Sequence, residues 1–225
     1  MSNIINIEWI TTNWDVVLDL AIAHVGLAVP AILGTFILAI PIGWLAHRAG
    51  QSRRWRPARA SIILLTGVLF GIPSLALFVL LPVILGTSIL SPLNVVIALL
   101  IYGVALQTRV VAEGFDANDN RATEAADALG YSRARRFWAV DLPLAGPSIL
   151  AGMRVVSAST ISLVSVGTLI GVGSLGDLLT AGFQRNFPTQ ILVGILATVA
   201  LAILFDLALV LVGRLVMPWR TKAGL

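Results

Sequence analysis

Long apolar runs dominate this sequence and restrict it to one kind of fold. The chain of 225 residues is 58% hydrophobic and only 12% charged, about half the roughly 25% charge of soluble domains. A membrane span takes about 20 apolar residues, and five segments are long enough: 20–46, 61–85, 92–112, 144–170 and 190–212. Backbone groups in lipid need partners within the same segment, so these runs must be helices. The sequence therefore predicts an all-α, polytopic membrane helical bundle with five transmembrane helices.

Arginines predict the orientation of the bundle. They gather between spans one and two, between spans three and four, and after span five, which places all three stretches on one side. These basic residues are Arg48, Arg53, Arg54, Arg56, Arg59, Arg121, Arg133, Arg135, Arg136, Arg214, Arg220 and Lys222. The other side holds only Arg185. Because cytoplasmic loops are rich in Lys and Arg, we expect the N-terminus outside the cell and the C-terminus in the cytoplasm.

The first 19 residues differ from the spans. They carry Glu8, Asp15 and Asp19 among tryptophans, which favours an N-terminal interfacial or extracytoplasmic helix. A sixth span here would instead move the N-terminus inside. We expect three parts in the chain: segment 1–19, a transmembrane domain over 20–216, and a cytoplasmic tail over 217–225.

The fourth span is unusually rich in small and hydroxyl residues. Such residues let helices approach closely and hydrogen-bond to one another, so this span is either the central packing helix or the lining of a polar path, and both can hold together. The candidate path residues in this span are Ser157, Ser159, Thr160, Ser162 and Ser165. Pro73 and Ser74 interrupt the second span and join this set, although ordinary bundle packing explains such a proline equally well.

Two intramembrane charges are further candidates for the path. Charges at this depth usually face the bundle interior or water. Arg154 lies in span four and Asp206 in span five, and an ion pair between them is conceivable. A snorkelling Arg154 is the alternative. His24 and His47 are isolated and are predicted to be interfacial.

A glycine-rich run follows the fourth span, on the side expected to be outside. Its candidate residues are Gly171, Gly173, Gly176 and Asp177. It follows no strand and lies on the wrong side for nucleotides, which favours a flexible or re-entrant outer element.

The polar segment between spans three and four, residues 113–143, carries the most specific pattern. Asn118, Asn120 or Thr123 can cap a short helix that ends at Gly130, where glycine suits a left-handed C-cap. Ser132 can cap a second helix over 133–140, and Leu142-Pro143 leads into span four. A small-residue helix surface with carboxylates is suited to docking against another protein.

This pattern resembles the E-A-A-x3-G-x9-I-x-L-P loop of ABC-importer permeases, with Val140 at the usual Ile position. Similar stretches begin at Gly71, Leu142, Ile149 and Gly171, and together they resemble the osmoprotectant branch, which imports glycine betaine, carnitine or choline. The resemblance covers about residues 20–212. It implies the type I ABC-importer permease fold with a cytoplasmic coupling-helix loop. The coupling residues that it implies are Glu124, Ala125, Ala126, Asp127, Gly130, Leu142 and Pro143.

The resemblance also implies partners in a bacterial cytoplasmic membrane. These are an ABC ATPase subunit, a second permease copy or a paralogue, an extracytoplasmic solute-binding protein and membrane lipid. No binding domain follows span five, so we expect the binding protein to be a separate chain. We expect no nucleic-acid partner.

The absence of certain residues argues against an enzyme. The sequence has no cysteine, and its only lysine is Lys222, so it lacks a Walker A lysine. We expect no catalytic residue, cofactor or metal here, and ATP bound by the partner subunit. The alternatives are a permease for methionine or another amino-acid-like solute, and, from another class, a channel or membrane scaffold. Neither of the last two explains the loop.

Overall fold

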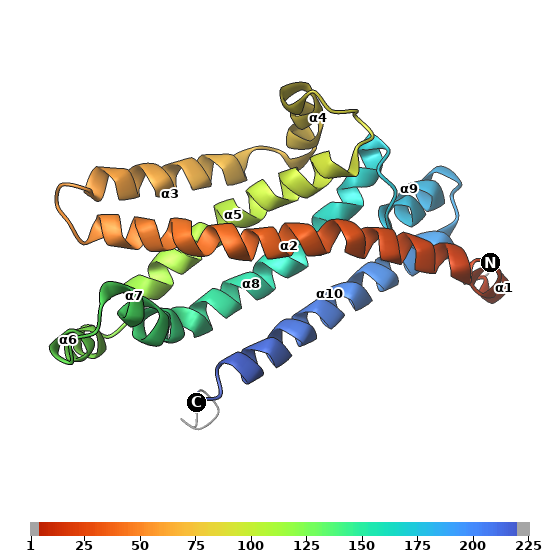
Figure 1. Cartoon of the computed structure of the whole chain (residues 1–225). Helices are drawn as coiled ribbons and strands as arrows, with labels where there is room; N and C mark the ends of the chain where they lie inside the picture. Colours follow the sequence, from red (N-terminus) through yellow and green to blue (C-terminus); the bar gives the residue numbers. More distant parts are fainter. Residues whose placement is uncertain (1–4, 220–225) are drawn as a thin grey trace. The chain divides into compact units, whose positions relative to one another are not determined.

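The folded chain consists of helices and short connections (Figure 1). The computed structural model describes residues 5–219, and no strand occurs in that range. The elements are α1 (Ile7–Thr12), α2 (Trp14–Gly50), α3 (Arg56–Gly71), α4 (Ser74–Leu85), α5 (Pro92–Asp116), α6 (Asn120–Ala128), α7 (Arg133–Arg136), the π-helical turn η1 (Phe137–Asp141), α8 (Leu142–Val164), the 3-10 helix η2 (Ser165–Ile170), α9 (Gly176–Gln184) and α10 (Pro188–Val216).

Four helical stretches are long and apolar enough to cross a membrane: α2, α5, Arg133–Ile170 and α10. The pair α3 and α4 makes a fifth span if counted together. The predicted second span over 61–85 is therefore divided into two helices bent by 102°, at the proline that was expected to interrupt it. Pro73 precedes α4 with φ −56° and ψ 130°, and a proline disfavours helical geometry in the residue before it, so the helix breaks there. The prediction of an all-α membrane bundle is confirmed, with four to five spans.

The N-terminal segment contains a short helix of its own. The side chain of Asn6 caps α1 by accepting a hydrogen bond from the Trp9 amide. The long helix α2 then begins at Trp14, before the predicted start of the first span at residue 20. The interfacial position of this segment stays a prediction.

The described helices pack as two compact units, which we treat separately. The first unit contains residues 5–34, 72–102 and 157–206, and the second contains residues 35–71, 103–156 and 207–219. The predicted transmembrane domain over 20–216 runs through both. Within the described residues, every arginine except Arg185 belongs to the second unit. Most of the predicted tail, with Arg220 and Lys222, lies outside the described residues.

The first unit packs α9 against the start of α2. Val17, Leu175 and Leu178 form a buried cluster with Trp9 and residues of α10 around it. Trp9 also meets Phe187 edge to face, with ring centroids 5.6 Å apart. His24 is fully buried here, and its Nε2 lies 2.9 Å from the Ile161 carbonyl oxygen. The predicted interfacial, isolated position of His24 is therefore wrong.

The second unit packs α2, α5 and α8 around aromatic and small residues. Val111, Phe115, Ala145 and Ile149 form its buried cluster. Gly43 permits the close approach of α2 and α5, because a Cβ at this position would lie 2.6 Å from Val111 Cβ and 2.7 Å from the Thr108 carbonyl oxygen.

Gly43→Ala is expected to destabilise the protein, because neither the Val111 Cβ nor the Thr108 backbone can move away cheaply. Overpacking of this kind costs about 1–3 kcal/mol. Gly26→Ala is the matched control on the same helix, since open space surrounds that position and alanine is the better helix former. The melting temperature of the purified protein in detergent should fall for Gly43→Ala alone. Equal melting of the two variants would contradict this packing.

Candidate functional site

The short polar helix α6 is capped at its start by Asp119. The Asp119 carboxylate accepts a hydrogen bond from the Arg121 amide at 2.9 Å. The cap was expected at Asn118, Asn120 or Thr123, and those predictions are wrong. Asp119 is the residue directly before the helix and has extended backbone geometry, φ −66° and ψ 121°, which is what an N-cap requires. Its charge also interacts favourably with the positive end of the helix dipole.

Gly130 ends α6 with a left-handed backbone, as the sequence predicts. Its φ is +76°. The Tyr131 amide donates to the Ala126 carbonyl at 3.1 Å, and the Gly130 amide donates to the Asp127 carbonyl at 3.0 Å. This pair of bonds is the Schellman motif, which satisfies carbonyls at a helix end. Ser132 then caps α7, its Oγ accepting from the Arg135 amide at 3.3 Å, which confirms the second predicted cap.

The predicted helix over 133–140 contains a widened turn. After α7, the Leu142 amide donates to the Phe137 carbonyl five residues earlier, which is π-helical pairing. Pro143 explains the change, because in an α-helix its ring would collide with the carbonyl four residues before it, that of Ala139. The widened turn therefore lets the chain pass directly from α7 into α8.

Arg136 joins α6 to η1, directly before α8. Its Nη1 lies 2.9 Å and 2.7 Å from the two carboxylate oxygens of Asp127, and its Nε lies 3.4 Å from Asp141 Oδ2. The Arg136 side chain is only 14% exposed. Asn118 adds a bond from Nδ2 to the Asp141 carbonyl at 2.8 Å. Charge-assisted bonds are the strongest protein hydrogen bonds, so α6, η1 and α8 are linked as one piece.

A second polar cluster holds the end of α5, just before α6. Asp116 accepts from Arg59 of α3 at 2.5 Å and lies 2.6 Å from Nδ1 of His47 on α2. Gln51 Nε2 lies 2.9 Å from the other ring nitrogen of His47. His47 is therefore not isolated, contrary to the prediction. Three helices meet at one carboxylate, and α6 starts four residues later.

The candidate coupling residues divide into two groups. Glu124 and Ala125 are exposed on α6. Ala126 is 4% exposed and faces its own chain, and Asp127 is held by Arg136. Leu142 and Pro143 are partly buried at the start of α8. Glu124, Ala125 and Gly130 are exposed without such contacts, and Asp127 stays 55% exposed beside Arg136.

Two residues in this segment were missed. Leu129 is 75% exposed, and the signal for it was a large apolar residue directly before the glycine of a polar helix. Arg136 had no such signal, because its two partners lie nine residues before it and five after it.

The candidate path residues of α8 do not share one environment. Ser157 and Thr160 are buried, Ser159 and Ser165 are partly buried, and Ser162 is exposed. Arg154 and Ala158 are also exposed, at the i, i+4 spacing of one helical face. Pro73 is exposed, whereas Ser74 and Asp206 are partly buried. The role of all these residues stays a prediction.

The glycine-rich segment that follows η2 forms a tight turn and a helix. Gly171 has φ +84°, and the Ser174 hydroxyl accepts from the Gly176 amide at 3.1 Å. A Cβ on Gly176 would lie 2.5 Å from Thr168 Oγ1, so this glycine serves packing. Gly173 is exposed, and Asp177 lies in the first turn of α9.

Within the described part of the chain, no group of three or more His, Cys, Asp or Glu side chains is placed to hold a metal ion. The segment from α6 to η1 presents an exposed surface, and ion pairs connect this surface to the start of a long helix.

The family model for the inner membrane component of binding-protein-dependent transport systems matches residues 39–221. The glycine betaine/carnitine/choline transport system permease protein OpuCD of Bacillus subtilis is 28% identical, over 94% of this chain and 89% of that protein. The carnitine transport permease protein OpuCD of Listeria monocytogenes is also 28% identical, over 96% and 93%. The osmoprotectant import permease protein OsmY of Salmonella typhimurium is 32% identical over 65% and 61%.

Solved structures share the fold. A chain of the MetNI methionine ABC transporter, from a study of its inward-facing conformations, superposes with a TM-score of 0.77 at 19% identity. The match covers 89% of this chain and 95% of that one. The type I importer permease fold expected from the sequence agrees with this match.

Arg136→Gln is expected to loosen α6, because two carboxylates lose their shared guanidinium. Hydrogen bonds to charged groups are worth about 1.5–3 kcal/mol, so amide hydrogen exchange across residues 121–131 should accelerate by about tenfold or more. Arg121→Gln removes an exposed positive charge from the same helix and is the control. Unchanged exchange in Arg136→Gln would show that the ion pairs do not hold α6 in place.

Proposed function

The chain belongs to the family of binding-protein-dependent transport system inner membrane components, and we propose that it moves a small quaternary-ammonium osmoprotectant inward through an ABC importer. Members of this family are membrane-spanning transport subunits, and in such systems ATP hydrolysis resides in a separate subunit. The substrate, the partners and the orientation are our proposal.

The exposed face of α6 carries this proposal. Glu124, Ala125 and Leu129 present a carboxylate, a small residue and an aliphatic anchor on one short helix, which suits insertion into a cleft of an ATPase. A docking helix transmits motion only if it is joined stiffly to the span behind it. Arg136 and the cap at Gly130 supply that connection. On closure of the ATPase around ATP, α6 would move and carry η1 and α8 with it.

We propose that the exposed face of α8, which carries Arg154, Ala158 and Ser162, contributes to the solute path. The pore does not need to neutralise the charge of a zwitterionic solute, and this chain has few intramembrane charges. Ser157 and Thr160 support the path from behind through helix packing, since they are buried within the chain.

A second permease copy or a paralogue completes the path. The most apolar stretch of α10 has none of its residues buried inside the chain, and α3 exposes Leu64, Leu65 and Val68. These surfaces need lipid or another subunit to cover them. Symmetric pairing about a two-fold axis is the commonest arrangement for such subunits.

The substrate class rests on the relatives. Their printed substrates are glycine betaine, carnitine and choline, which share a trimethylammonium group. A permease for methionine or another amino-acid-like solute is the second candidate, favoured by the fold match to the methionine transporter.

The test is uptake by the complete transporter in proteoliposomes, with its cognate ATPase and binding protein. We expect ATP-dependent uptake of at least one of the three quaternary-ammonium solutes. Gly130→Val should lose uptake and solute-stimulated hydrolysis, because a β-branched residue resists a positive φ at a cost of roughly 1–2 kcal/mol. Gly130→Asn is the matched control, since asparagine tolerates this conformation and a side chain meets no atom within 4 Å there.

Three outcomes would contradict the proposal. Uptake of methionine without any quaternary-ammonium solute would select the second candidate. Full activity in Gly130→Val, or equal loss in both variants, would remove the coupling role argued for this cap.

Orientation is tested by labelling in intact cells. We propose that the arginine-rich second unit faces the cytoplasm. A cysteine at exposed Ser52 should then be protected from an impermeant thiol reagent, and one at exposed Gln184 on α9 should react. The native chain contains no cysteine, so the background is zero. The opposite labelling pattern would reverse the topology.

A further inference from the structure

A large apolar groove lies within the second unit, formed by α2, the α7–η1 segment, α8 and α10. Its volume is about 1100 Å³, slightly above the roughly 300–1,000 Å³ of small-molecule pockets. Aliphatic and aromatic side chains form its walls, among them Phe36, Ile37, Leu150 and Val212. From Phe36 to Arg48 the groove follows α2 for about 18 Å at 1.5 Å per residue. This length is close to one leaflet of a hydrocarbon core about 30 Å thick.

Two arginines line the same groove. Arg48 lies near the end of α2, and Arg133 is the first residue of α7. Among residues 5–219, neither forms an ion pair with a carboxylate. The guanidinium of Arg48 instead lies 5.6 Å from the centroid of the Trp44 ring, a cation–π contact that holds it in place. An apolar groove of leaflet length with two unpaired cations is complementary in shape and charge to an anionic amphiphile.

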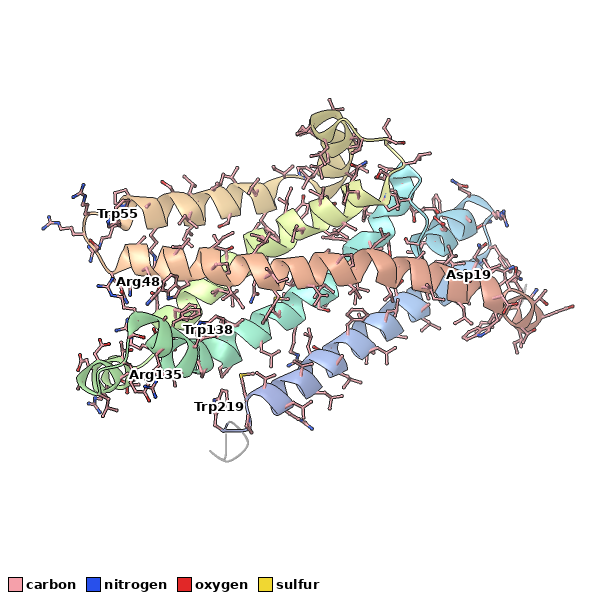
Figure 2. All side chains as sticks on the ribbon, viewed as in Figure 1. Asp19, Arg48, Trp55, Arg135, Trp138 and Trp219 are labelled. Carbon is pink, nitrogen blue, oxygen red and sulfur yellow. The ribbon has the colours of Figure 1, made fainter. Side chains whose placement is uncertain are left out.

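Three tryptophans line the groove together with the two arginines. Trp44, Trp138 and Trp219 all line it, and Trp138 and Trp219 lie at the end of the second unit that also holds Arg48 (Figure 2). Trp138 and Trp219 are 69% and 45% exposed. Tryptophan is enriched where headgroups meet the hydrocarbon core, so the arginines stand at headgroup depth.

We propose that this groove binds one anionic phospholipid, with its acyl chains along the apolar walls and its phosphate between Arg48 and Arg133. Basic pockets between membrane helices recognise anionic headgroups in this way. A second copy of the chain is a poorer occupant, because most carboxylates of the second unit already have partners in their own chain. Asp116, Asp127 and Asp141 pair with His or Arg of their own chain.

The bound lipid would touch the segment that joins α6 to α8. Arg133 and Trp138 lie in the sequence on either side of Arg136 and Phe137. A headgroup bound at Arg133 would therefore lie against the π-helical turn. This inference is independent of the transported solute. Lipid binding is measured directly, and its failure would leave the transport proposal standing.

The experiment is native mass spectrometry of the delipidated protein titrated with phosphatidylglycerol or phosphatidylcholine. We expect one phosphatidylglycerol to bind in preference to phosphatidylcholine. Arg48→Gln and Arg133→Gln should each weaken it roughly fivefold, the effect of one interfacial cation. Lysine at both positions should restore most of the affinity. Arg53→Gln with Arg54→Gln is the matched control, because both side chains are exposed near the same helix end but outside the groove.

A variant of the apolar wall gives an independent result. Val212→Trp fills the groove without changing any charge, and it should lower the binding of phosphatidylglycerol. Equal binding of the two lipids would overturn the proposal, as would equal losses in the groove and control arginine variants. So would a disulfide between Ile37→Cys of one copy and Val212→Cys of another, which would show that protein fills the groove.

Discussion

Hydrocarbon offers no hydrogen-bond partner to a peptide group, and this constraint shapes the whole chain. Every spanning segment must be a helix, and the helices must then associate without the help of water. Small residues provide the contact, because Gly43 lets α2 reach Val111 on α5, and Gly152 lets α8 reach Val110. Polar side chains buried in the bundle find backbone acceptors, as Gln107 does at the Ile149 carbonyl, 2.9 Å away. The ion pairs of Asp116, Asp127 and Asp141 lie instead near helix ends, around α6.

These ion pairs connect separate elements of the second unit. Exposed pairs contribute little, but Arg136 is mostly buried and bonds to two carboxylates on different elements. The Asp116 carboxylate likewise connects two other elements, because it pairs with both Arg59 and His47. The segment that carries α6 is thereby held at both ends, by the end of α5 before it and by η1 after it. A short helix held in this way can be moved by a partner protein without first folding or unfolding.

Much of this arrangement could be predicted from sequence because it is encoded locally. Apolar length predicted the spans, and the positive φ of Gly130 and the cap at Ser132 followed from residue type and position. Contacts between distant residues could not be read in the same way. The Ile161 carbonyl beside His24 and the Asp116 carboxylate beside His47 lie 137 and 69 residues away in the sequence, so both histidines looked isolated in local patterns. The burial of Ser157 and Thr160 depends on how α8 is rotated about its own axis, which hydroxyl content alone does not reveal.

The widened turn at Phe137–Asp141 lies between Gly130 and Pro143. It gives a physical reason why the number of residues between these two positions should be fixed. Each residue advances a helix by about 100° and 1.5 Å, and the link from α7 to α8 contains no flexible loop to absorb a change. Loss or gain of a single residue there would swing the exposed face of α6 by more than a quarter turn around the axis of α8. Leu129 would then point in a different direction even with every side chain intact. Most connections in proteins tolerate insertion and deletion. In this one, the rotation of α6 about the axis of α8 matters as much as the side chains that α6 carries.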